Sequence, residues 1–407
     1  MKKGLFIANF ILLAQFSFAQ TFINYSDVDG LVSNNVLCVD ANASDNIWFG
    51  TQLGVSNFDG ASWITYETAT YPDMADNNIL SIYIDVADRT WIGTDFGTSV
   101  LESGAWTTYT TDDGLGNNKV QCINEDSDGN MWFGTITGLS KFDGATWTTF
   151  GTGDGLPFGG VKSITLNDDG NLWIGTGLGG VAIYNGTDFT EITEDEGLIS
   201  DKIRGIDFSP SGQTWVATAE GVTSLDAADA VLANHTTIFT LPEPDTLNPI
   251  VDIKVDDNGV VWAGVYVDYL VSEGGVCAYN GSTWFQFDVD DGLAGPVING
   301  LDIDENNDVW VVTSTGVTKI SDHTLKLDQN SSKEISNLNF YPNPANTMIN
   351  FDPSIDQLGH NMTIYNLLGE KVLTTKIEMN MTVEVSTWTP GIYFIVSDQL
   401  REKLIVQ

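Results

Sequence analysis

The sequence has few of the residues on which most enzyme chemistry depends. Its 407 residues include three histidines and three cysteines. His235, His323 and His360 are widely separated, and no recognised spacing assembles one of them with a serine or cysteine into a catalytic triad. No histidine pair has the spacing of a zinc motif. The sequence therefore predicts neither a Ser-His-Asp hydrolase nor a zinc enzyme, and it indicates no metal or cofactor.

Basic residues are also scarce, with 16 lysines and arginines against 55 aspartates and glutamates, and the net charge is −39. Nucleic-acid phosphates and anionic membrane surfaces repel such a chain, so neither is an expected partner. Long apolar runs are absent, since no stretch approaches the ~20 apolar residues that a spanning helix needs. We therefore predict no transmembrane segment in the mature chain.

Residues 1–19 have the pattern of a secretory signal peptide. Two lysines precede the apolar run Leu5–Leu13, and the small-x-small sequence Ser17–Ala19 follows it. We expect cleavage between Ala19 and Gln20, with no cysteine at the new terminus to accept a lipid. The mature protein is therefore expected to be exported.

A tryptophan recurs seven times, at intervals of 43, 41, 41, 42, 47 and 48 residues. Most copies continue with a small residue and then threonine, as in "WFGT" and "WIGT". Aliphatic residues recur nine and twelve positions before each tryptophan, and small or short side chains recur ten positions before it. Such a period indicates an array of structural repeats. The tryptophans are Trp48, Trp91, Trp132, Trp173, Trp215, Trp262 and Trp310.

Each repeat predicts four short strands. The first carries the aliphatic columns and ends in an acidic turn such as "EDSDGN", the second holds the tryptophan, and the third ends at an Asp-Gly or Asn-Gly turn. The fourth carries an aromatic pair such as Trp147 and Phe150. The acidic turns are interpreted as hairpin formers, because the alternative, a calcium loop, lacks its distal glutamate. Four strands every 40–45 residues are typical of a propeller blade.

The two ends of the repeat region complete each other. The seventh repeat ends near Ile320 without an aromatic fourth strand, whereas Phe22–Tyr25 stands alone before the first repeat. We predict that Phe22–Tyr25 forms the outer strand of the seventh blade, which leaves no sheet edge open. The predicted fold is all-β: a seven-bladed β-propeller over residues 20–320, closed by an N-terminal outer strand, plus a small C-terminal β-sandwich.

The cysteines are too few and too scattered for a disulfide framework. Cys38 and Cys122 fall in the column of small residues ten positions before the tryptophan. We predict that they are compact buried thiols where the inner strands converge, and we expect Cys277 to be a buried thiol as well.

The repeats resemble a known family. "DGLVSNNVLCVDANASDNIWFGTQLGVSNFDG" and "DGLGNNKVQCINEDSDGNMWFGTITGLSKFDG" are similar to the two-component regulator propeller repeat, and the resemblance covers about residues 20–320. It implies a relation to the periplasmic sensing regions of hybrid histidine kinases and to stand-alone secreted proteins. The kinase and the membrane span of those sensors are not in this sequence, so a direct signalling role is not expected.

After a polar linker over residues 321–336, the pattern changes to short alternating runs that predict a separate domain over residues 337–407. "NFYPNPANTMINF", "IYNLLGEKV", "TPGIYFIV" and "EKLIVQ" resemble the type A C-terminal sorting domain of type IX secretion substrates. The resemblance implies export by the type IX secretion machinery, to the surface or the exterior of a Gram-negative, Bacteroidota-type bacterium. An ordinary accessory β domain is the alternative. The matching positions are Tyr341, Pro342, Asn343, Pro344, Gly369, Gly391, Tyr393 and Lys403.

The scarce cations of the propeller repeats gather near the first strands. First strands line the channel of a propeller, and the "DGLxxN" loops before them form one mouth of it. An enlarged loop in the sixth repeat adds two tyrosines, and such a funnel suits a sugar or an acidic oligosaccharide. Alternatively, the cations neutralise crowded acids and the asparagines satisfy turns. The predicted ligand-binding residues are Asn35, Asn78, Lys119, Lys162, Lys202, Arg204, Tyr266 and Tyr269.

These patterns predict a non-enzymatic, secreted or surface-attached propeller that binds a glycan, peptide or protein at the channel mouth. One alternative is a carbohydrate-active lyase or hydrolase that uses carboxylates of the channel. The other alternative is an extracellular sensing partner of a separate membrane receptor.

Overall fold

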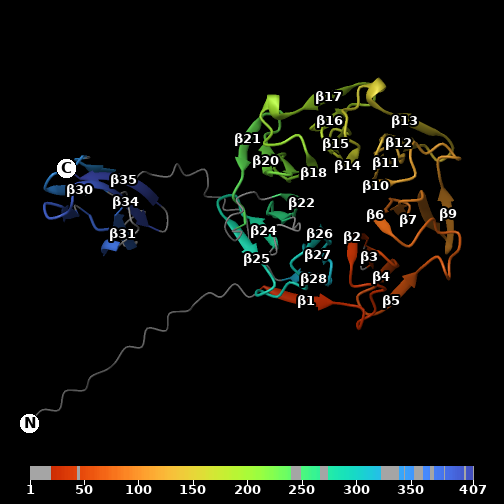
Figure 1. Cartoon of the computed structure of the whole chain (residues 1–407), viewed down its shortest axis with the longest axis horizontal. Helices are drawn as coiled ribbons and strands as arrows, with labels where there is room; N and C mark the ends of the chain where they lie inside the picture. Colours follow the sequence, from red (N-terminus) through yellow and green to blue (C-terminus); the bar gives the residue numbers. More distant parts are fainter. Residues whose placement is uncertain are drawn as a thin grey trace, which may run out of the picture. The chain divides into compact units, whose positions relative to one another are not determined.

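The computed structural model describes residues 20–43, 46–239, 249–265, 274–321, 339–342, 344–352, 361–366, 371–379, 381–397 and 400–406. The chain divides into two compact units, Met1–Asp328 and Gln329–Gln407. In the first unit, strands β1 to β28 form seven four-stranded antiparallel sheets, which Figure 1 shows arranged as a ring. The seven-bladed propeller predicted from the tryptophan spacing is confirmed.

Six of the seven blades consist of four consecutive strands. Blade 1 contains β2 (Val36–Ala43), β3 (Asn46–Thr51), β4 (Gly54–Phe58) and β5 (Trp63–Tyr66). Blade 2 contains β6 (Ile79–Ile84), β7 (Thr90–Thr94), β8 (Thr98–Glu102) and β9 (Ala105–Tyr109). Blade 3 contains β10 (Val120–Glu125), β11 (Met131–Thr135), β12 (Gly138–Phe142) and β13 (Trp147–Phe150).

Blade 4 contains β14 (Val161–Leu166), β15 (Leu172–Thr176), β16 (Val181–Tyr184) and β17 (Phe189–Ile192). Blade 5 contains β18 (Ile203–Phe208), β19 (Thr214–Thr218), β20 (Gly221–Leu225) and β21 (Val231–His235). Blade 6 contains β22 (Ile250–Val255), β23 (Val261–Val265), β24 (Val276–Tyr279) and β25 (Trp284–Phe287). Two short 3-10 helices, Thr152–Asp154 and Glu194–Glu196, lie in the loops before blades 4 and 5.

Blade 7 combines the two ends of the repeat region. It contains β26 (Ile298–Ile303), β27 (Val309–Thr313), β28 (Gly316–Ser321) and, as its outer strand, β1 (Thr21–Tyr25). Strand β1 runs antiparallel to β28, with Tyr25 opposite Val317. The ring of Tyr25 stacks 5.8 Å from that of Trp310 in its own blade and lies 5.2 Å from that of Phe58 in blade 1. The predicted N-terminal closure is therefore confirmed.

The first strand of each blade lies at the centre of the ring, in contact with the first strands of both neighbouring blades (Figure 1). Because the strands alternate in direction, the loop that enters the first strand and the loop that joins the second and third strands share one end of every blade. Backbone hydrogen bonds join these loops, such as Gly97 N–H to Asn118 O at 2.8 Å. We call this end the mouth face, and the opposite end carries the acidic turns.

An aspartate of the acidic turn holds the blade tryptophan in four blades. In blade 3, Asp126 Oδ1 accepts hydrogen bonds from the backbone N–H groups of Asp128 and Asn130. Its Oδ2 accepts from Trp132 Nε1 at 2.8 Å, and Lys141 lies over the indole ring. These turn carboxylates are therefore held by the hairpin and by the tryptophan. The equivalent pairs are Asp85 with Trp91, Asp256 with Trp262 and Asp304 with Trp310.

The small residues of the first strands pack against a glycine of the second strand. A Cβ on Gly134 would overlap Cys122 Sγ and also meet Val161 of the next blade, and Gly50 has the same relation to Cys38. Cys38 and Cys122 are half-buried and line the channel cavity, whereas Cys277 is buried as predicted. Partial loss of water contact raises the pKa of the Cys38 and Cys122 thiols to about 12, so both stay protonated at neutral pH. These contacts are the ones expected of a compact filler where blades converge.

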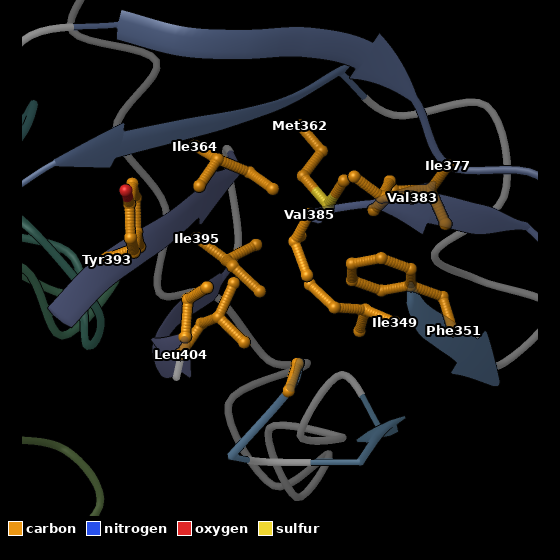
Figure 2. Packing of buried hydrophobic residues seen from close by; sticks show 12 residues of the cluster. Ile349, Phe351, Met362, Ile364, Ile377, Val383, Val385, Tyr393, Ile395 and Leu404 are labelled. Carbon is orange, nitrogen blue, oxygen red and sulfur yellow. The ribbon is translucent and has the colours of Figure 1, made fainter. Parts of the chain in front are cut away.

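The second unit contains two sheets, in the orders β29-β30-β33 and β32-β31-β34-β35. Side chains from both sheets form one core, in which Figure 2 shows Ile349 and Phe351 of one sheet close to Met362 and Ile395 of the other. The small C-terminal β domain is therefore confirmed. Its strands are β29 (Asn339–Tyr341), β30 (Met348–Asp352), β31 (Asn361–Asn366), β32 (Lys371–Lys376), β33 (Thr382–Glu384), β34 (Gly391–Ser397) and β35 (Leu400–Val406).

The positions predicted for the sorting motif are partly exposed and partly buried. Tyr393 is buried, and its hydroxyl donates to the backbone oxygen of Thr389 at 2.7 Å, so this ring belongs to the core (Figure 2). Tyr341, Pro342 and Pro344 are exposed near β29, Gly391 begins β34 and Lys403 lies in β35. Asn343 and Gly369 lie outside the described residues.

Replacing Tyr25 with alanine should lower the free energy of unfolding by about 2–4 kcal/mol, because the ring packs against both blades at the closure. Urea unfolding of the wild type and the variant measures this loss. Ile23→Ala is the control, since Ile23 lies on the same strand but is exposed. Equal losses for the two variants would contradict a closure held by Tyr25.

In blade 4 the turn residue that corresponds to the tryptophan-bonding aspartate is an asparagine, Asn167. Asn167 Oδ1 accepts the turn N–H groups, which leaves only its amide nitrogen, a donor, for the indole. The buried Trp173 Nε1 has no hydrogen-bond partner among the described residues. Asn167→Asp supplies an acceptor and should raise the free energy of unfolding by about 1 kcal/mol. Urea unfolding tests this, and Asn185→Asp, in an exposed turn of the same blade, should give no such gain.

Candidate functional site

A side chain near the end of the first strand joins most blades to the next one. Asp40 Oδ2 of blade 1 accepts from Ile84 N of blade 2 at 2.9 Å. Asp302 Oδ2 of blade 7 accepts from Ala41 N of blade 1 at 2.8 Å, so this set of bonds also spans the closure. The other bonds join Asn124 to Ile164, Thr165 to Ile206 and Asp207 to Val255. The base of the channel is therefore fixed by bonds from one blade to the next.

Lys254 forms the centre of a charge group at this level, in blades 5 to 7. Its Nζ lies 3.0 Å from Asp302 Oδ1. Loss of water contact alone would lower the pKa of Lys254, but the carboxylates of Asp302, Asp252 and Asp207 raise it above its usual value. Burial raises the pKa of Asp207 to about 6, although Lys254 opposes this shift. The group holds three carboxylates and one ammonium.

The channel carboxylates are occupied by these structural contacts. Asp252 accepts from the backbone N–H of Leu301 at 3.1 Å, and Asp207 accepts from Val255 at 2.7 Å. Each is therefore committed to the joint between two blades rather than presented to a substrate. In the part of the chain that the structure describes, no group of three His, Cys, Asp or Glu side chains could hold a metal ion.

The channel contains a cavity of about 250 Å³ lined by the first strands of all seven blades, and its wall includes Asp252 and Lys254 of the charge group. One arc of its wall is cationic, with Lys162 of β14 beside Arg204 of β18. Lys162 Nζ donates to Gln121 Oε1 at 3.3 Å. Loss of water contact and repulsion from Arg204 and Lys119 lower the pKa of Lys162. The wall residues at the same strand position in the other blades are Leu37, Leu80, Val251 and Asn299.

The structure brings the four predicted cations to the mouth side of blades 3 to 5. Lys119 Nζ lies 2.7 Å from Asp95 Oδ1, on the second-to-third-strand loop of blade 2. Lys202 is exposed, and its backbone oxygen accepts from Ala219 N–H in a neighbouring loop. Lys162 has no carboxylate within ion-pair distance among the described residues. Lys119, Lys162 and Arg204 are close enough to repel one another, in a chain whose net charge is −39.

The predicted amides are occupied by contacts within the protein. Asn35 Oδ1 accepts from Asn299 Nδ2 at 3.4 Å, and Asn78 Nδ2 donates to Asp95 Oδ2 at 3.1 Å. The neighbouring Asn34, Asn77 and Asn118 each accept from a backbone N–H of their own loop. The alternative that asparagines satisfy turns is therefore supported. Tyr266 and Tyr269 lie outside the described residues.

Sequence reasoning missed an apolar feature of the mouth face. Five large apolar side chains from blades 1 to 4 and the loop before blade 4 are between 47% and 72% exposed there. The available signal was an apolar residue at the tip of four successive second-to-third-strand loops, together with "PFGG" in place of the polar residues of the "DGLxxN" loop. We call these side chains the apolar rim. They are Leu53, Phe96, Ile136, Phe158 and Leu178.

Part of the apolar rim is contiguous with the cations. A Cβ on Gly159 would lie 2.9 Å from Leu178 Cβ, and one on Gly160 would lie 3.0 Å from Ile136 Cα. A Cβ on Gly177, next to Leu178, would lie 3.4 Å from Lys162 Cε. Phe158, the most exposed of the five, directly precedes the two glycines. Blade 4 therefore presents apolar side chains beside an ammonium group at the channel entrance.

Each of the two units contains residues that match a known family. Residues 114–137 and 155–177 match the two component regulator propeller, and residues 339–407 match the secretion system C-terminal sorting domain. The chain therefore carries regulator-type propeller repeats and a sorting domain that directs export to the cell surface or secretion. No helix among the described residues is long and apolar enough to cross a membrane. No curated protein matches the chain.

Solved structures with low identity share the fold. The extracellular domain of a hybrid two component system from B. thetaiotaomicron is 19% identical over 95% of this chain and 57% of that chain, with a TM-score of 0.62. PorZ, a surface component of the type-IX secretion system of Porphyromonas gingivalis, is 17% identical over 92% and 60%, with a TM-score of 0.57. The chain therefore spans less than two thirds of both proteins.

Virginiamycin B lyase from Staphylococcus aureus also has this fold. It is 12% identical over 74% of this chain and 98% of that chain, with a TM-score of 0.58. At such identities the likeness concerns the fold alone, and the similar structures include an extracellular domain of a two component system as well as a lyase.

The charge group at the base of the channel predicts a pH dependence of stability. Between about pH 4 and pH 6 the unfolded chain ionises Asp207 while the native state keeps it protonated, so stability falls as the pH rises through this range. Asp207→Asn removes this component, so its stability relative to the wild type should rise by ~2 kcal/mol between pH 4 and pH 7.

Urea unfolding at both pH values measures that difference. The exposed Asp112→Asn is the control, because it removes the same charge without changing the channel. A pH dependence that is the same in the wild type and in Asp207→Asn would contradict the assignment.

Proposed function

We propose that this chain is a secreted or surface-displayed binding protein that holds its ligand at the channel mouth. The observation that carries the proposal is the concentration of Lys119, Lys162, Lys202 and Arg204 at one entrance of a protein with a net charge of −39. Lys119 is paired with Asp95, but Lys162 has no carboxylate within ion-pair distance among the described residues. Burial and repulsion from Arg204 and Lys119 make the charge of Lys162 costly unless an anion relieves it. The ligand is a glycan, a peptide or a protein that carries an acidic group.

A carbohydrate-active enzyme receives less support. The carboxylates of the channel accept backbone N–H groups or pair with Lys254, as structural residues do. The regulator-type repeats are compatible with a role as the sensing partner of a membrane receptor. That role requires a second protein, and it would use the same mouth face. Binding without catalysis is therefore the function we put forward.

Lys162→Gln should weaken binding of an acidic ligand at least tenfold, because it removes the cation at the channel entrance. The test screens the mature chain, residues 20–407, against a glycan array and a displayed peptide library, and then measures affinity for the best probe with both proteins. Lys371→Gln, an exposed lysine of the C-terminal domain, is the charge-matched control. If the probe binds Lys162→Gln and Lys371→Gln with the affinity of the wild type, the binding site lies away from the channel mouth.

A further inference from the structure

The apolar rim is not explained by folding. Leu53, Phe96, Ile136, Phe158 and Leu178 lie on loops of one face, whereas Val86, also largely exposed, lies on an acidic turn at the opposite end of its blade. Large exposed apolar side chains that gather on one face of a soluble protein mark an interaction surface. In blade 4, Lys162 lies beside the loop that carries Leu178.

The chemistry of this surface does not match a sugar. Glycans are held by aromatic rings together with amide or carboxylate groups that bond to their hydroxyls. The rim has two phenylalanines, but its two leucines and its isoleucine offer neither a ring nor a polar group. The mouth amides of Asn35 and Asn78 are already bonded to Asn299 and Asp95. These bonds hold Asn35 Oδ1 and Asn78 Nδ2 in contacts within the protein, which reduces the polar capacity that the mouth offers to sugar hydroxyls.

A lipid surface matches it no better. Four of the rim residues lie on loops that alternate with "DGL" loops, and Phe158 lies on a "DGL" loop itself. The carboxylates of these "DGL" loops are exposed, among them Asp112, Asp113 and Asp154. Those charges repel anionic headgroups. Lys162 and Arg204 line the wall of the cavity inside the entrance, where an extended chain reaches them and a flat surface does not.

We infer that the mouth face binds a polypeptide segment that places apolar side chains on the rim of blades 1 to 4 and a carboxylate against Lys162 and Arg204. This inference narrows the proposed function and rests on it. The apolar side chains supply contact area, because removing them from water favours the bound state. The carboxylate sets the register of the segment, because it is attracted to the cation cluster and repelled by the surrounding acids.

The test uses the mature chain and a random twelve-residue peptide library displayed on phage. Selected peptides should pair aspartate, glutamate or a free C-terminal carboxylate with leucine, isoleucine or phenylalanine. A synthetic peptide from the selection should lose at least tenfold in affinity with the double variant Phe158→Ser, Leu178→Ser, and at least tenfold with Lys162→Gln. Val86→Ser should bind like the wild type. All changed side chains are at least partly exposed, and equal melting temperatures check that the fold is kept.

Two further probes separate this inference from the proposed function. An acidic oligosaccharide, or vesicles containing phosphatidylglycerol, that need Lys162 but bind the Phe158→Ser, Leu178→Ser variant unchanged would overturn the polypeptide inference and keep the mouth as the binding site. A third outcome would overturn both the polypeptide inference and the proposed function. In that outcome no mouth variant changes the affinity of the selected peptides, and Lys162→Gln does not change binding of the other probes.

Discussion

The propeller depends on hydrogen bonds and ion pairs that cross from the first strand of one blade to the first strand of the next. Each blade is a small sheet that cannot bury its faces alone, and the ring forms only if every blade is packed between two neighbours. Asp302 accepts from Ala41 across the closure, as Asp40 accepts from Ile84 one blade later. Buried carboxylates are costly without such partners, so these bonds select one angular spacing of the blades.

This constraint leaves the two ends of the channel with different tasks. At the base, side chains bond one blade to the next, and Lys254 with its carboxylates belongs to these contacts between blades. At the mouth, the first strands have just begun and their side chains need not bond to the next blade. Lys162 and Arg204 therefore line a cavity, and the loops above can vary in sequence. The sequences of the blades differ most in these loops, where the fold does not require the same residue in every blade.

The fold followed from the sequence because its determinants are periodic. Seven tryptophans fix the blades, and the lone Phe22–Tyr25 strand fixes the closure, since both signals repeat or complete a unit. The candidate site remains a prediction, because a polar residue type does not show whether its side chain is free to bind a ligand. Asn35 and Asn78 are polar but already bonded, which no spacing reveals. Phe158 and Leu178 were overlooked because an apolar residue in a repeat suggests packing, and only the surface shows that they are exposed.

The position of β1 has a consequence for the order in which the protein matures. Thr21 pairs with Ser321, so the earliest strand of the propeller finds its partner only after six blades have been made. Contacts of such large sequence separation form slowly because the intervening chain must first be ordered. Until then blade 7 lacks its outer strand and the ribbon of blades remains open. The ring therefore closes only when the five residues of β1 are free to pair with β28.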